Sequence, residues 1–244
     1  MKPLFDLHTH TVASGHAYST MKENIEAARE RGLEALGLSD HAPAMPGAPH
    51  SFYFGNFKVI REYILGVRIV QGIEANITSL SGAMDVDDAL ASRLDYVIAS
   101  LHPPCVPSGT AEENTAAIAA AMRTPWVRII GHPDDSRYPL DYEELVLAAR
   151  QENVALELNN SSFSPSSGRV GARENVAKML PLCAAYGVPI VMASDAHIYY
   201  DVGAMEECER IVKTLDFPRE LVLNYRPDGL DLILSRRESP CFLR

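Results

Sequence analysis

Three observations predict an α/β fold in which parallel strands alternate with helices. Short apolar runs and longer segments of helical period follow one another along the chain. No linker or low-complexity tract divides it, and a length of 244 residues suits one α/β barrel. We therefore expect a single domain, residues 1–244, whose seven strand–helix units close into a barrel. A doubly wound open sheet remains the alternative, because periodicity does not show closure.

Seven apolar runs predict the strands, over residues 4–10, 34–41, 68–77, 95–102, 127–133, 155–160 and 189–197. Helical period predicts helices over residues 21–32, 56–64, 111–123, 141–153, 172–187 and 203–215. Ser19 or Thr20 and Asp141 are start signals, and Gly32 and Gly187 are stop signals. The tail from residue 221 predicts one more short strand and a helix that opens near Pro227.

Composition narrows the class of protein. The formal charge of -10, with no basic block, argues against nucleic-acid and anionic-membrane partners. Four scattered cysteines without CxxC pairing suit a reducing compartment, so we expect a cytoplasmic protein. The first 16 residues do not resemble a secretory signal, and the longest uncharged stretch, residues 180–193, is too short to span a membrane.

Chemistry-bearing residues gather at the ends of the predicted strands. Six of the eight histidines lie there, together with carboxylates and two asparagines: His8, His10, Asp40, His41, Glu74, His102, His132, Asn159, Asn160, Asp195 and His197. Parallel strands end at one face of the sheet, so these side chains should converge. His16 can fold back over that face, whereas His50 lies in a loop and is interpreted as an ordinary surface histidine.

Nitrogen and carboxylate ligands without thiolates suit Zn²⁺, Mn²⁺ or Fe²⁺. Nine candidate ligands are too many for one tetrahedral ion, so two or three ions are expected: His8, His10, His16, His41, Glu74, His102, His132, Asp195 and His197. A serine or cysteine triad is a weaker alternative, because no GxSxG elbow is present. Neither GxGxxG nor GxxxxGK appears, which argues against a bound nucleotide.

These residues resemble the motifs of the PHP (polymerase and histidinol phosphatase) superfamily, in order and from end to end: DLHTH, His16, SDH at 39–41, GIE at 72–74, SLH at 100–102, GHP at 131–133 and SDAH at 194–197. The segments APHSFYFGN, GIEANI, ALELNNSSF, EECERI and FPRELVLN resemble its YcdX-type metal-dependent phosphatases. The resemblance implies a distorted TIM-like (β/α)7 barrel with three divalent ions, usually zinc.

Carried over by position, the resemblance implies three metal positions. One would be held by His8, His10 and Asp195, with Glu74 as a bridge; a second by Glu74, His102 and His132; a third by His16, His41 and His197. The expected activity is hydrolysis of phosphoric monoesters by a metal-bridging hydroxide, with a small phosphorylated substrate. The loops 42–49 and 163–171 look altered, which leaves the substrate open.

Four further residues receive supporting roles as hypotheses. Asp6 and Asp40 are expected to orient ligand imidazoles, with plain hydrogen bonds to backbone as the alternative. Arg169 and Arg173 are candidates for contacting phosphate. Two other functions stay open: a PHP-type nuclease acting on nucleic-acid ends, against which the missing basic groove speaks, and a metal-binding module without turnover. The oligomeric state is not predicted.

Overall fold

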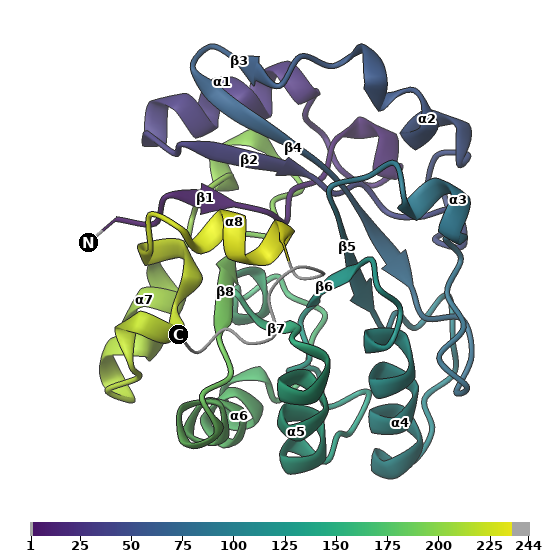
Figure 1. Cartoon of the computed structure of the whole chain (residues 1–244), viewed down its shortest axis with the longest axis vertical. Helices are drawn as coiled ribbons and strands as arrows, with labels where there is room; N and C mark the ends of the chain where they lie inside the picture. Colours follow the sequence, from purple (N-terminus) through teal and green to yellow (C-terminus); the bar gives the residue numbers. More distant parts are fainter. Residues whose placement is uncertain (1, 236–244) are drawn as a thin grey trace.

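The computed structural model describes residues 2–235 as an α/β barrel (Figure 1). Seven parallel strands follow the order β1-β2-β4-β5-β6-β7-β8, and their bounds are β1 Phe5–Asp6, β2 Ala35–Leu38, β4 Val67–Asn76, β5 Tyr96–Ser100, β6 Val127–Ile130, β7 Ala155–Asn159 and β8 Ile190–Ala193. All seven lie within the predicted runs apart from the first residue of β4. The predicted parallel sheet is confirmed, and the open doubly wound alternative is not.

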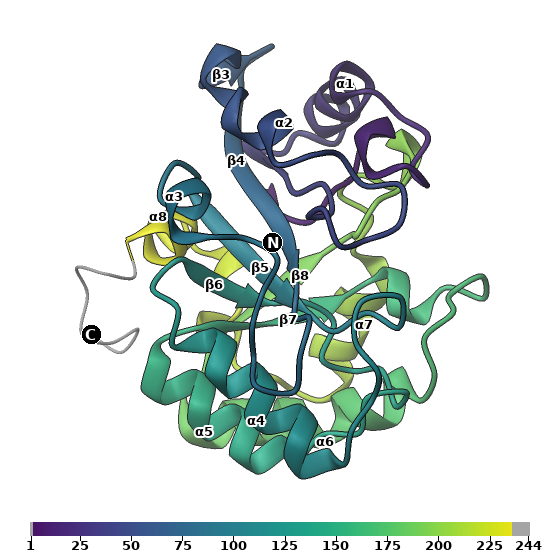
Figure 2. The ribbon, with the colours of Figure 1, turned by 90° about the vertical axis from the view of Figure 1, so that its right-hand side faces the viewer.

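Helices surround the sheet, and α4, α5 and α6 lie side by side outside β5–β8 (Figures 1 and 2). Their bounds are α1 Met21–Arg31, α2 Phe52–Gly55, α3 Asp88–Ala91, α4 Ala111–Met122, α5 Tyr142–Glu152, α6 Ala172–Tyr186, α7 Glu206–Thr214 and α8 Gly229–Leu234. Short 3-10 turns, η1 to η6, occupy Val12–Ser14, Phe57–Val59, Ser161–Phe163, Tyr199–Asp201, Arg219–Leu221 and Leu223–Tyr225. Among the described residues, no helix is both long and apolar enough to cross a bilayer.

The predicted start and stop residues of three helices are confirmed. Thr20 forms a capping box with Glu23 at the start of α1, and Asp141 accepts hydrogen bonds from the first backbone N–H groups of α5. Gly32 and Gly187 end α1 and α6 in the left-handed conformation that glycine adopts without steric cost.

Two local predictions are wrong. Residues 56–64 do not form a helix: η2 is followed by β3 (Tyr63–Ile64), which folds back antiparallel onto β4. Leu65 and Gly66 both have positive φ, as a two-residue hairpin turn requires, and pairing with β4 outweighs the helical pattern. The expected tail strand is instead η5 and η6, where Val222 makes a single bridge to Ile190, whereas the expected helix is present as α8.

The barrel is nearly closed, and Asn224 spans the gap between its first and last strands. No ladder joins β1 and β8 in the described chain; an isolated bridge links Thr9 to Ala196 beyond the strand ends. The buried Asn224 side chain donates to the carbonyls of Phe5 (2.9 Å) and Met192 (2.8 Å), and accepts from the Met192 N–H (2.7 Å). These bonds satisfy backbone groups that the missing ladder would leave unpaired.

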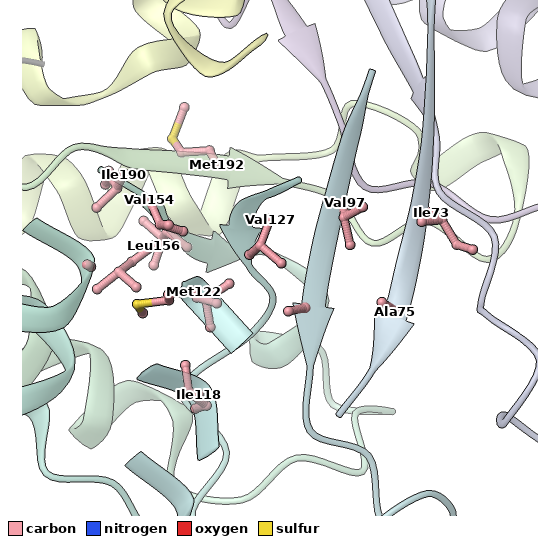
Figure 3. Packing of buried hydrophobic residues seen from close by; sticks show 14 of the residues in the cluster. Ile73, Ala75, Val97, Ile118, Met122, Val127, Val154, Leu156, Ile190 and Met192 are labelled. Atoms are coloured by element: carbon pink, nitrogen blue, oxygen red, sulfur yellow. The ribbon is translucent and has the colours of Figure 1, made fainter. Parts of the chain in front are cut away.

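The core has two parts, one inside the barrel and one between sheet and helices. Tyr96 fills the interior, where its hydroxyl donates to the Leu7 carbonyl at 2.5 Å. Gly72 lies beside it on β4 because a Cβ there would stand 2.2 Å from the tyrosine ring. The outer part includes Val97 and Val127 of the sheet and Met122 of α4 (Figure 3). The rigid frame that results fixes where each strand ends.

Candidate metal centre

The nine predicted ligands converge at the carboxyl end of the barrel. Glu74 lies near the end of β4, and the remaining eight lie in the segments that follow β1, β2, β5, β6 and β8. His8 and His10 fall just beyond the short β1, yet their rings lie 5.1 Å apart, as two residues on one side of an extended segment should. Seven of these residues are buried, whereas His197 is partly exposed and His16 is exposed.

Glu74 stands at the middle of the cluster. Its Oε2 lies 3.4 Å from Nε2 of His8 and 3.5 Å from Nε2 of His10. Its Oε1 lies 3.2 Å from Nε2 of His102 and 3.0 Å from Nε2 of His132. One buried carboxylate therefore faces two separate pairs of imidazoles.

Asp195 faces the same pair as Oε2 of Glu74. Its Oδ1 lies 3.5 Å from Nε2 of His8 and 3.2 Å from Nε2 of His10. Its Oδ2 accepts a hydrogen bond from Arg169 at 2.7 Å. The two carboxylate oxygens of Asp195 thus point to different neighbours.

The other three histidines, the exposed His16, the partly exposed His197 and the buried His41, lie next to one another. The ring of His16 lies 4.9 Å from the rings of both His41 and His197, centroid to centroid. The ring of His10 lies 4.3 Å from each of the same two rings. The four rings of His10, His16, His41 and His197 therefore pack against one another in this part of the cluster.

The donor atoms fit divalent cations. Among the described residues, Nε2 of His8, Nε2 of His10, Nδ1 of His41 and Oε2 of Glu74 are buried without a hydrogen-bond partner. Buried polar atoms almost always have partners, so four such atoms in one cluster fit a site for a divalent cation. Three overlapping groups have ligand atoms within 4.8 Å of one another: His10, His41 and His197; His8, His10 and Glu74; His41, Glu74 and His102.

Protonation of His10 and His102 matches this chemistry, whereas at His8 burial is outweighed by the Glu157, Asp195 and Glu74 carboxylates, which hold its pKa well above the ordinary value in the absence of a cation. Burial lowers the pKa of His102 to about 4, and burial with repulsion from His197 and His41 holds the pKa of His10 well below its ordinary value. Both rings are therefore neutral near pH 7 and offer a lone pair. Burial opposes ionisation of Glu74, but His41, His8 and His102 outweigh it and hold its pKa well below the usual range.

The structure tests the expected roles of Asp6 and Asp40 and gives a different answer for each. Asp6 does not contact an imidazole; its carboxylate accepts from Ser194 Oγ (2.5 Å) and from the backbone N–H groups of His8, Ser194 and Gly203, the backbone alternative. Asp40 contacts an imidazole only through a serine. It accepts a hydrogen bond from Ser14 Oγ (2.7 Å), and this oxygen lies 3.1 Å from Nδ1 of His10.

The structure also places the two candidate arginines and His50. Arg169 is partly buried beside Asp195, whereas Arg173 is exposed and pairs with Glu207. His50 stays outside the cluster, where its Nδ1 accepts the Phe52 N–H. A cavity of about 650 Å³ opens beside the centre, and its lining includes His16, Asp195, His197, Arg137, Arg169 and Phe163. The altered loop of residues 163–171 forms much of its wall.

Sequence reasoning missed Glu157 on β7. Its Oε1 lies 2.7 Å from Nδ1 of His8, and its Oε2 accepts the His132 backbone N–H at 2.6 Å. Burial opposes its ionisation, but His8 holds its pKa below the ordinary value. The two-residue period of ALELN places Glu157 on the same side as Asn159, which is the sequence signal that could have found it.

Comparisons with known proteins agree with this architecture. A probable phosphatase of Clostridium novyi is 46% identical over 224 residues, covering 92% of this chain and 91% of that protein. A probable phosphatase of Acetivibrio thermocellus is 42% identical and covers 98% of each chain. The structure of histidinol phosphate phosphatase from Lactococcus lactis, complexed with zinc, L-histidinol and phosphate, has a TM-score of 0.62 at 17% identity and covers 89% of this chain and 95% of that one.

The structural likeness, at this low identity, shows the fold. The sequence comparisons go further, since the profile of the PHP domain matches residues 6–161 and the relatives named above cover at least nine-tenths of this chain. This chain belongs to the PHP domain family.

Proposed function

We propose that this protein is a metal-dependent phosphatase that hydrolyses phosphoric monoesters of small compounds with three divalent ions, zinc foremost. The observation that carries the proposal is the position of Glu74 between two pairs of imidazole Nε2 atoms, all buried in one cluster. A carboxylate with imidazoles on both sides is the arrangement that holds a pair of divalent ions. The relatives named probable phosphatases support the reaction class.

The residues would divide among three positions. His8, His10 and Asp195 would share the first with Glu74, and His102 and His132 would share the second with Glu74; the third would be held by His16, His41 and His197. When bound, such ions lower the pKa of a coordinated water and neutralise charge on a phosphoryl group. The short contact between His41 and Glu74 suggests that the third position lies close to the other two.

The cavity supports a small substrate. Its volume of about 650 Å³ suits a metabolite-sized leaving group. His16 and His197 belong both to its wall and to the histidine cluster, so a phosphate held at the cluster would place its ester group in the cavity. Arg137 and Arg169 on the wall add positive charge on that side, although each already pairs with an aspartate.

A nuclease has less support. The chain carries a formal charge of -10, and a duplex or single strand would need a basic groove to hold its phosphates. A metal-binding module without turnover would not need the cavity that adjoins the cluster.

The test measures three hydrolysis reactions with one preparation. Metal-free protein reloaded with Zn²⁺, Mn²⁺ or Fe²⁺ is incubated with p-nitrophenyl phosphate, bis(p-nitrophenyl) phosphate and single-stranded DNA. We expect metal-dependent hydrolysis of the monoester and little release from the other two. Degradation of DNA without monoester hydrolysis would favour the nuclease, and no reaction with any substrate would favour the module. A panel of phosphorylated metabolites, including histidinol phosphate, then defines the substrate.

A further inference from the structure

Strand β7 differs from the other six parallel strands. Each of the others carries or precedes a proposed metal ligand, whereas β7 contributes none of the nine. Yet Glu157 and Asn159 of β7 are among the most buried polar residues of the chain, at 1% and 0% exposure. Burying a carboxylate and an amide is costly unless each has a structural or chemical task.

Glu157 contacts proposed ligands that follow two other strands. Its Oε1 lies 2.7 Å from Nδ1 of His8, and its Oε2 accepts the backbone N–H of His132 at 2.6 Å. When Nδ1 of His8 donates to this carboxylate, the lone pair of its Nε2 faces Glu74 and Asp195, at 3.4 Å and 3.5 Å. A carboxylate behind a histidine fixes the tautomer and the direction of a metal-binding imidazole in this way.

Asn159 extends the same contact set to the other side of β7. Its Nδ2 donates to Oε2 of Glu157 at 3.0 Å and to Oδ2 of Asp195 at 3.1 Å. Arg169 donates to the same Oδ2 at 2.7 Å and to Oδ1 of Asn159 at 3.2 Å. With Oδ2 occupied by these two donors, Oδ1 of Asp195 remains directed at His8 and His10.

The ligands on both sides of β7 have strained backbones. His132, after β6, has a φ of 30°, and Asp195, after β8, has a φ of 53°. Non-glycine residues at positive φ cost free energy and persist where surrounding contacts hold them. Strands β6, β7 and β8 are neighbours in the sheet, so β7 is placed to hold both residues.

We propose that Glu157 is a positioning residue for the metal centre: it directs His8 and holds His132, and through Asn159 it shares the positioning of Asp195 with Arg169. The inference rests on the proposed metal-dependent function, and assigns to β7 a role in forming the centre without ligating an ion. None of these contacts requires Glu157 to touch substrate.

The experiment measures metal affinity rather than activity. Glu157→Gln keeps the size of the side chain, but its amide group cannot accept both the His8 ring N–H and the His132 backbone N–H. Wild type, Glu157→Gln and the control Glu34→Gln, which removes an exposed carboxylate next to β2, are titrated with Zn²⁺ against a chromogenic chelator. Circular dichroism establishes that all three are folded at the temperature used.

We expect Glu157→Gln to bind the weakest-held ion about 10- to 100-fold less tightly than wild type, with Glu34→Gln unchanged. A purely structural role would lower the thermal midpoint of the metal-free protein and leave the affinity of its folded form unchanged. Cobalt substitution adds a spectroscopic readout, because altered ligand geometry changes the visible absorption bands of Co²⁺.

A second variant covers the case in which Glu157→Gln does not fold. Asn159→Ala removes the amide contacts to Glu157 and Asp195 and leaves the Arg169 bond to Asp195 in place, so we expect a milder, roughly 10-fold loss of affinity. Unchanged affinity in the folded variants would overturn this inference alone. Wild-type protein that binds no divalent ion would overturn the proposed function together with it.

Discussion

Oε2 of Glu74 lies 2.6 Å from Nδ1 of His41, yet neither atom makes a hydrogen bond. Both belong to the set of buried orphan atoms, and Oε2 also faces the Nε2 atoms of His8 and His10. A divalent cation held between this carboxylate oxygen and the three imidazole nitrogens would give all four atoms a partner. The role assigned to Glu74 is therefore the first to test.

Glu74→Gln should lower both bound metal and activity. The amide keeps the volume but loses the negative charge and one acceptor, so it can no longer bridge two ions. We expect at least one ion fewer per chain by elemental analysis, and a fall in p-nitrophenyl phosphate hydrolysis of about 100-fold or more. Glu34→Gln, which changes an exposed carboxylate, should retain both properties. Full metal content in Glu74→Gln would contradict the bridging role.

Asp134 should make the metal-free protein less stable as the pH rises from 4 to 6. Burial raises its pKa to about 6, so the folded chain binds this proton more tightly than the unfolded chain does. The free energy of unfolding then falls by about 2 kcal/mol across this interval, as part of about 3 kcal/mol over the whole titration for a difference of about two pKa units.

The non-ionising variant Asp134→Asn serves as the reference for that prediction. Urea unfolding of both proteins with a chelator present, at pH 4, 5 and 7, isolates the Asp134 contribution. We expect the wild-type free energy of unfolding to drop relative to the variant between pH 4 and 7. Parallel pH profiles would show that Asp134 ionises without a penalty.

Gly72→Ala should destabilise the barrel interior. The added Cβ would stand 2.2 Å from Cζ of Tyr96. The ring cannot easily move away, because its hydroxyl donates a hydrogen bond to the Leu7 carbonyl. Overpacking of this kind costs about 3 kcal/mol in unfolding free energy. Gly55→Ala is the matched control, since its Cβ would meet nothing within 4 Å. Equal denaturation midpoints for the two variants would argue against a close-packed interior.

Asn224→Ala should weaken barrel closure. The change leaves the N–H of Met192 and the carbonyls of Phe5 and Met192 without their side-chain partner. Unpaired buried backbone groups cost about 1 to 3 kcal/mol each, and we expect a total loss of about 4 kcal/mol by chemical denaturation. Asn56→Ala, at an exposed position, should stay within about 0.5 kcal/mol of wild type. A small loss at Asn224 would mean that the gap between β1 and β8 needs no bridge.

Local patterns sufficed to predict most of the strands and helices and the gathering of the proposed ligands at one face of the barrel. Strand runs and helix caps such as Thr20 and Asp141 involve neighbours a few residues apart, so the sequence displays them directly. The strand period placed His8 and His10 on one side, and the common direction of parallel strands brought the other ligand positions to the same face. These inferences needed no knowledge of specific long-range contacts.

Tertiary structure alone decided the contacts between distant segments. Glu157 meets His8 across 149 residues, and Asn224 meets Phe5 across 219. No local pattern encodes such pairs, because they form only after the strands have taken their order and register. The same holds for residues 56–64, where pairing of β3 with β4 outweighed helical periodicity, and for Asp6, whose partners Ser194 and Gly203 come from the far end of the chain. The sequence thus determined which residues reach the mouth of the barrel, and packing determined which side chains hold them there.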